Sequence, residues 1–187
     1  HLILALSICR YQVMDAIVER AVEMGISRIQ PFYSEHSFIR KKDSLPRGKM
    51  DRWNKIVKSA TQQSGRGDLM PMATPIDFSE LPQIFNPKEG NLGLFAYEGS
   101  CVMGIKEHLR GSEKNNRLLP LLGRPYEEIW MFIGSEGGFS QTEVKDFKKW
   151  GLEPVSLGEQ VLRVETACIA LASILKYECN LMQSGGF

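Results

Sequence analysis

Hydrophobic positions along the chain follow two spacings, one typical of helices and one typical of strands. The segments YQVMDAIVERAVEMG and DRWNKIVKSATQQS repeat apolar residues at the spacing of an amphipathic helix, and Gly25 ends the first of them. Four short apolar runs are expected to be strands: ISRIQPFY, NLGLFAY, EIWMFIG and PVSL. Helices that alternate with strands predict an α/β fold, with a parallel sheet flanked by helices.

Two further helices are expected in the last third of the chain. Ser140 and Glu143 form an S-x-x-E capping box, which predicts a helix that ends at Gly151. The last helix, expected from about Glu165 to Met182, is apolar on nearly every side. Such a helix is buried on every side, either inside the domain or under a second subunit. The pattern leaves both alternatives open.

Composition indicates an ordinary globular domain. The chain has 187 residues, of which 43% are hydrophobic and 24% charged. No apolar stretch reaches the roughly 18 residues of a membrane span, and no signal peptide pattern is present. The cysteines have no metal-ligand spacing, so we expect reduced thiols and no metal. We therefore expect a cytoplasmic protein without a membrane partner.

Positive charge is concentrated in one segment although the net charge is only +1. From Arg40 to Lys58 the chain has eight basic residues and two acidic ones. Such a patch can contact RNA phosphates, but a solvated helix face and loop have the same pattern. The candidates for RNA contact in this patch are Arg40, Lys41 and Lys42.

The segment IWMFIGSEGGFSQTE carries a glycine-rich loop between an expected strand and an expected helix. A loop in this position can hold a phosphate. However, the spacing of Gly134, Gly137 and Gly138 matches neither the dinucleotide fingerprint nor the Walker loop, and Glu136 stands where a phosphate would bind. Phosphate is therefore excluded. A turn without a ligand and a close approach of the backbone to a different ligand both remain open.

Four segments together resemble the RsmE-type 16S ribosomal RNA uridine methyltransferases, which belong to the SPOUT class. These segments are VERAVEMGISRIQPFYSEHS, RWNKIVKSATQQSGR, FIGSEGGFSQTEV and VSLGEQVLRVETACIALAS, in the family's order. The resemblance covers essentially the whole chain, and it implies a single SPOUT domain at residues 1–187 with a C-terminal deep trefoil knot. The family's N-terminal PUA-like RNA-binding domain is missing, so we expect this chain to be part of a longer enzyme.

The resemblance implies S-adenosylmethionine as the cofactor, bound by three backbone loops. This ligand has a sulfonium cation and no phosphate, so the Glu136 carboxylate is tolerable beside it. The expected cofactor-binding residues are Phe95, Tyr97, Glu98, Ile133, Gly134, Glu136, Gly137, Gly138, Leu157, Gly158, Val161 and Leu162.

The implied reaction is transfer of the cofactor's methyl group to N3 of a uridine in 16S ribosomal RNA, within the 30S subunit. We expect Arg163 to stabilise negative charge on the uracil oxygens, Glu165 to orient Arg163 or act as a base, and Thr166 to join them by hydrogen bonding. Ordinary first-turn helix chemistry is the alternative for Glu165 and Thr166. The resemblance also implies a homodimer.

Other residues of the matching segments have two interpretations. Arg66, Ser34 and Ser37 are candidates for contact with RNA or a second subunit, or they serve the structure of their loops. A lone loop histidine such as His36 is more often a hydrogen-bonded side chain than a base. Ser135 replaces the proline typical of the family's glycine loop, and Gln160 replaces a residue that is often basic.

Two other functions remain compatible with the sequence. One is a SPOUT methyltransferase that modifies another nucleotide of ribosomal RNA or a nucleotide of transfer RNA. The other is a non-catalytic module that binds RNA or assists ribosome assembly.

Overall fold

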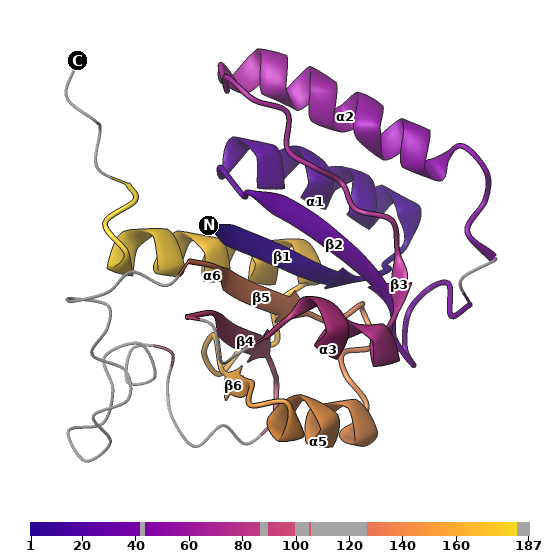
Figure 1. The fold of residues 1–187 in the computed structure, drawn as a ribbon, viewed down its shortest axis with the longest axis vertical. Coiled ribbons are helices and arrows are strands. Elements are labelled where there is room, and N and C mark those ends of the chain that lie inside the picture. The colour runs from indigo at the N-terminus through magenta and orange to yellow at the C-terminus, as the bar shows by residue number, and fades with distance from the viewer. Residues whose placement is uncertain (42–43, 87–89, 100–104, 106–126, 183–187) are drawn as a thin grey trace.

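Six parallel strands form one sheet in the computed structural model, which describes residues 1–41, 44–86, 90–99, 105 and 127–182. The strand order is β3-β2-β1-β5-β4-β6, and every neighbouring pair is parallel (Figure 1). The bounds are β1 Leu2–Ser7, β2 Arg28–Tyr33, β3 Ile76–Asp77, β4 Leu92–Ala96, β5 Ile129–Ile133 and β6 Glu153–Val155. The predicted parallel α/β fold is confirmed.

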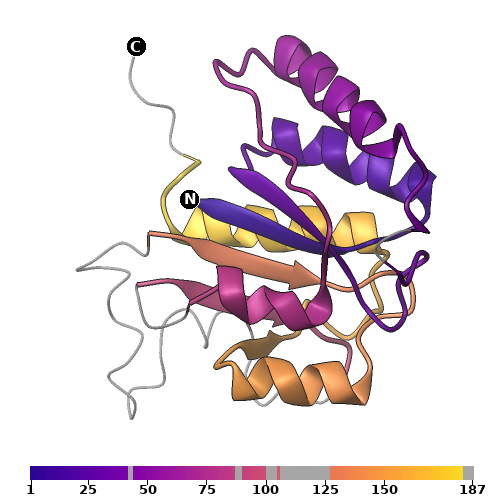
Figure 2. The same ribbon diagram turned by 45° about the vertical axis from the view of Figure 1, so that its right-hand side comes forward.

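Helices cover both faces of this sheet (Figures 1 and 2). Helices α1, α2 and α6 share one hydrophobic core with the sheet, while α3 and α5 share the other. A short 3₁₀ helix, η2, lies between β3 and α3. The bounds are α1 Tyr11–Glu23, α2 Lys49–Ser64, η2 Phe78–Glu80, α3 Leu81–Ile84, α5 Gln141–Lys149 and α6 Val164–Glu178.

The strands read as continuous apolar runs because both of their faces are buried. In β1, Leu4 and Leu6 join the core under α1 and α6, whereas Ile3 and Ala5 join the opposite core. That opposite core is largely aromatic, and its centre is Phe147 of α5, which is fully buried. Sandwiched between two cores, the sheet is a rigid support for the loops at its edges.

The predicted helices and strands are confirmed, with two differences. The last helix ends at Glu178, not near Met182, because Asn180 adopts a left-handed φ of 55°. The prediction missed β3, η2 and α3, since two-residue strands and four-residue helices leave no periodic pattern.

Helix α6 is not enclosed on every side by the residues that the structure describes. Its buried positions, such as Leu171 and Leu175, form one face, while Tyr177 on the other face is 71% exposed. Of the two alternatives that the apolar pattern left open, enclosure by the domain itself is not what the described residues show, and cover by a second subunit stays a prediction. Within the described part of the chain, no helix is long and apolar enough to cross a membrane.

Strands β1 and β5 lie next to each other, and the connections that follow them run toward opposite sides of the sheet. From β1 the chain proceeds toward β2 and β3, and from β5 it proceeds toward β6. Ligands of open α/β sheets bind outside the carboxyl ends of the strands at such a switch point. The loops that follow β1, β4, β5 and β6 meet at this edge.

Candidate functional site

A cleft of about 700 Å³ lies at the carboxyl ends of β4, β5 and β6. Its walls come from the three loops predicted from the sequence, together with Arg10 and Val13 from the start of α1. The cleft is lined by all the expected cofactor residues except Phe95, and by two of the three expected catalytic residues, Arg163 and Glu165. Its volume lies within the roughly 300–1,000 Å³ of small-molecule sites.

The glycine-rich loop after β5 makes a tight turn. The N–H of Gly138 donates to the carbonyl of Ser135 at 2.9 Å, and Gly138 has a φ of +66°. A Cβ on Gly134 would lie 2.9 Å from the carbonyl carbon of Gly138, and a Cβ on Gly137 would lie 2.8 Å from Cβ of His36. Both glycines are therefore required by the packing of the protein against itself, whether or not a ligand is bound.

The loop after β2, residues 34–38, is joined to this turn by two hydrogen bonds and to the following helix α5 by a third. Ser135 Oγ donates to the His36 carbonyl at 2.6 Å, and the His36 Nδ1 donates to the Gly137 carbonyl at 2.8 Å. The third bond runs from the Glu35 N–H to Glu143 Oε1 at 2.9 Å. The expectation that His36 is a hydrogen-bonded side chain is confirmed, and Ser135 contributes a bond that proline lacks.

Glu143 joins the start of α5 to the loop after β2. Its Oε2 accepts the Ser140 N–H at 2.9 Å and completes the predicted capping box, while its Oε1 accepts the Glu35 N–H. The residue is only 5% exposed, so the carboxylate depends on these donors in place of water. The capping box predicted the first bond, but no local pattern indicated the second.

A buried cluster of three serine hydroxyls supports the same loop. Ser7 Oγ lies 2.6 Å from Ser34 Oγ and 2.9 Å from Ser37 Oγ, and the Ser34 N–H donates to Ser37 Oγ at 2.7 Å. All three residues are buried. Of the two interpretations of Ser34 and Ser37, loop structure is the one confirmed.

Glu136 lies between the glycine-rich loop and helix α1. Its Oε1 accepts the backbone N–H of Arg10, the N-cap residue of α1, at 3.2 Å and lies 3.9 Å from the Arg10 Nε. A carboxylate is favourable at this end of a helix. The side chain of Glu136 remains 34% exposed and lines the cleft, so the cleft has a negative charge that disfavours phosphate.

The three expected catalytic residues lie around the start of α6. Arg163 is the N-cap residue with an exposed side chain, Glu165 is half-buried in the first turn, and Thr166 is exposed and does not line the cleft. The structure therefore brings Arg163 and Glu165 to the cleft and leaves Thr166 beside it.

Cys9 and Cys168 are buried free thiols. Burial raises the pKa of the Cys9 thiol far above its ordinary value, and the negative charge of Glu136 raises it further. Burial likewise raises the pKa of Cys168, followed by the charge of Glu165. Both thiols are therefore neutral at physiological pH, in agreement with the expected buried, reduced cysteines.

Several predicted residues lie away from the cleft. The Phe95 side chain is fully buried and stacks on Phe147 at 5.0 Å, so its place is the aromatic core. Arg66 donates to the carbonyl of Ile26 at 2.7 Å and pairs with Asp68 at 3.1 Å, near the amino end of β2. Its position at the opposite edge of the sheet separates it from the cleft.

The basic candidates near residue 40 lie on the surface. Arg40 and Lys41 are exposed, whereas Lys42 falls outside the described residues. Their contact with RNA stays a prediction.

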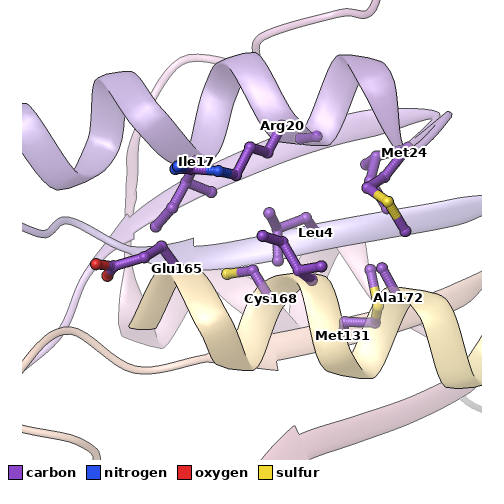
Figure 3. A pocket seen from close by; sticks show the side chains of 11 residues that line it. Leu4, Ile17, Arg20, Met24, Met131, Glu165, Cys168 and Ala172 are labelled. Atoms are coloured by element: carbon purple, nitrogen blue, oxygen red, sulfur yellow. The ribbon is translucent and has the colours of Figure 1, made fainter. Parts of the chain in front are cut away.

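A second, much smaller hollow lies between α1 and α6 (Figure 3). Its volume of about 10 Å³ holds no more than a water molecule. Arg20 of α1 and Glu165 of α6 flank it, and Glu165 also lines the large cleft. The large cleft is therefore the candidate ligand site. In the described part of the chain, His, Cys, Asp and Glu side chains form no group that could hold a metal ion.

Comparison with known families gives one match that covers most of the chain. The family model described as RNA methyltransferase domain matches residues 1–176. Ribosomal RNA small subunit methyltransferase E from Mesomycoplasma hyopneumoniae is 31% identical over 169 residues, 90% of this chain and 66% of that protein. The protein of the same name from Aquifex aeolicus is 31% identical over 163 residues, 87% of this chain and 62% of that protein. The chain thus spans less than two thirds of the length of these relatives.

Solved structures agree with this match. A ribosomal RNA small subunit methyltransferase E from Neisseria gonorrhoeae, bound to S-adenosyl methionine, has a TM-score of 0.76 at 26% identity. The match covers 95% of this chain and 65% of that one. A Legionella pneumophila protein in complex with the bound cofactor SAM has a TM-score of 0.78 at 26% identity, over 94% of this chain and 65% of that one.

Proposed function

Because the chain belongs to the RNA methyltransferase domain family, we propose that it transfers a methyl group from S-adenosylmethionine to 16S ribosomal RNA in the 30S subunit. The observation that carries the proposal is the cleft itself. Three loops that are separate in sequence line one cavity of about 700 Å³ at the switch point of the sheet. Relatives with the same fold bind this cofactor or are named for this activity.

The chemistry of the lining fits S-adenosylmethionine. This ligand has a sulfonium cation and no phosphate, and Glu136 gives the cleft a negative charge held in place by Arg10. Leu157 and Leu162 supply apolar surface, and the loop backbones supply N–H and C=O groups. A site with apolar walls and a few fixed polar groups is typical of small-molecule recognition.

We assign the substrate atom as N3 of a uridine. When bound, S-adenosylmethionine would supply the methyl group, its S–CH₃ bond breaking as the N3–CH₃ bond forms, so that S-adenosylhomocysteine would be left and the N3 proton would pass to a base. The cleft is open to solvent beside Arg163, so an unstacked base can reach it. In this proposal the exposed guanidinium of Arg163 stabilises negative charge on the uracil oxygens, and Glu165, in the first turn of α6, orients Arg163 or accepts the proton.

The proposal includes the knotted topology of the SPOUT class, in which the segment from β6 to α6 passes through a loop of the chain. The resemblance of the last two motifs and the TM-scores of 0.76 and 0.78 support it. A knot also explains how residues 157–163 reach the same cleft as the loops after β4 and β5.

We further propose that two copies of the chain associate through α6 as a homodimer in the cytoplasm. The outer face of α6 presents Ala170, Ser173 and Tyr177, all partly or largely exposed. Glu165 joins this region to the large cleft, because it lines both the cleft and the hollow between α1 and α6. A partner covering α6 would therefore lie beside the reaction site.

The test is methyl transfer by purified protein from radiolabelled S-adenosylmethionine to 30S subunits, followed by mass mapping of the modified nucleotide. We expect label at N3 of one uridine in 16S RNA. Arg163→Ala should lower the rate at least about 100-fold, because it removes an electrostatic stabiliser of the transition state. Cofactor affinity should change less than twofold, since the guanidinium is not needed to hold the ligand.

Two results would contradict the proposal. Label at another nucleotide or in transfer RNA would reassign the substrate. Binding of RNA without binding of S-adenosylmethionine would identify a non-catalytic RNA-binding module.

A further inference from the structure

An exposed aromatic side chain lies in the loop after β2. Phe38 is 53% exposed although its neighbours Ser37 and Ile39 are 3% and 8% exposed. The backbone here is firmly attached, because the Phe38 N–H donates to the Ile8 carbonyl at 2.8 Å. The ring is therefore presented to solvent by an ordered segment.

The orientation of the Phe38 ring is set by Tyr11. The two rings meet edge to face, with centroids 5.4 Å apart and planes at 83°. Tyr11 packs against the buried cluster of Ile8, Tyr33 and Ile39. The ammonium group of Lys49 lies 3.7 Å from the centroid of the Tyr11 ring. We call Tyr11, Phe38 and Lys49 the aromatic platform.

Basic residues follow Phe38 closely in the sequence, and one of them touches the platform. Arg40, Lys41 and Arg47 come from the same loop and are exposed, and Lys49 belongs to the platform itself. An aromatic ring beside basic side chains is the arrangement by which proteins hold single-stranded nucleic acid, with the base stacked on the ring and the phosphates near the charges. A protein partner would more often select an apolar patch depleted of lysine.

The platform adjoins the large cleft. Arg10 lines the cleft and Tyr11 is the next residue, so their Cα atoms are about 3.8 Å apart. On the other side, His36 contacts Gly137 of the glycine-rich loop two residues before Phe38. Figure 2 shows the loop after β2 beside the loop after β5. This surface is therefore within reach of a nucleotide next to one that is held in the cleft.

We propose that Phe38 stacks a base of single-stranded RNA that flanks the target nucleotide. The inference rests on the proposed function in one respect, namely that the neighbouring nucleotide is the one that is methylated. The stacking of a base on Phe38 does not depend on it. It adds a base-stacking residue to the charged candidates, and it assigns Tyr11 and Lys49 the role of positioning Phe38.

The test is fluorescence anisotropy of a 5′-fluorescein-labelled single-stranded RNA dodecamer titrated with purified protein. Phe38→Ala should weaken binding by roughly 5- to 150-fold, the effect of losing one base stack. Phe38→Trp should restore wild-type affinity or exceed it. The matched control is Leu69→Ala, which truncates another apolar residue that is 60% exposed and should change affinity less than twofold.

Salt dependence separates stacking from a general disturbance of the surface. Phe38→Ala should leave the slope of log K against log salt unchanged, whereas Arg47→Ala should reduce its magnitude by about 0.7, the contribution of one phosphate contact to a single strand. Unchanged affinity in Phe38→Ala, or failure of Phe38→Trp to rescue, would overturn the inference. Equal weakening by Leu69→Ala would do the same.

These outcomes are independent of the proposed function. If the unsubstituted protein shows no methyl transfer and no S-adenosylmethionine binding, the proposed function fails. The Phe38 substitutions still decide whether the platform stacks RNA.

Discussion

At the scale of single residues, the candidate site depends on a few polar side chains that do not themselves line the cleft. Glu143 and the serine cluster line no part of the cleft, yet they hold the loop that fastens the glycine-rich turn. Glu136 links that turn to α1 through the Arg10 N–H. Hydrogen bonds outside the lining of the cleft therefore hold its loops in place.

Glu143 gives the first prediction at this scale. Glu143→Gln keeps the shape of the side chain but replaces one acceptor oxygen with a donor, which then faces a backbone N–H. We expect the free energy of unfolding to fall by about 1–3 kcal/mol, measured by urea denaturation. The matched control is Glu19→Gln on the exposed side of α1, which should change stability by less than about 0.5 kcal/mol.

The buried thiols give a second prediction, for high pH. The pKa of Cys9 is raised in the folded state, so its thiol contributes stability that is fully present below its unfolded pKa of about 9 and is lost as the pH rises. Between pH 7.5 and pH 10 the wild type should lose about 1–2 kcal/mol more stability than Cys9→Ala. Equal losses in parallel urea titrations would show that the thiol does not remain neutral when folded.

At the scale of elements, helix α6 has two different faces. Its inner face packs on the sheet and on α1, and its first turn carries Glu165 to the cleft. Its outer face decides between the two alternatives that the sequence pattern left open. The apolar pattern was correct in indicating burial, but the described chain supplies cover for only one side.

Ala170→Arg tests the proposed cover of that outer face. A charged, long side chain at a partly exposed position is tolerable in a monomer but not in a packed interface. Light scattering should therefore show a dimer for the wild type and a monomer for Ala170→Arg. Gln62→Arg places the same residue at an exposed position of α2 and should leave the dimer intact. A wild-type protein that is monomeric at micromolar concentration would contradict the dimer.

At the scale of the whole molecule, the sequence predicted elements better than contacts. Apolar spacing identified α1 and α2, and short apolar runs identified β2, β4, β5 and β6, because these elements bury their apolar residues in the cores. The bond between His36 and Gly137 joins positions 101 residues apart, so no local pattern could indicate it. Phe95 was placed in the cofactor site from its motif, but strand alternation directs its side chain into the aromatic core.

The large cleft was predicted in outline for a different reason. Its three loops follow three parallel strands, and the carboxyl ends of parallel strands meet at one edge of a sheet. The ligand itself came from the resemblance of the motifs, because composition and spacing excluded phosphate without naming a replacement. The central claim is therefore that this cleft binds S-adenosylmethionine.

Calorimetric titration with S-adenosylmethionine tests that claim most directly. We expect one site per chain, weakened at least about tenfold by Gly134→Ala, because the added Cβ would press on the Gly138 backbone at 2.9 Å and displace the turn. Gly67→Ala is the control, since its Cβ would meet no atom within 4 Å, and it should bind like the wild type. An absence of binding to the wild type at millimolar ligand, or equal binding by Gly134→Ala, would contradict the assignment of the cleft.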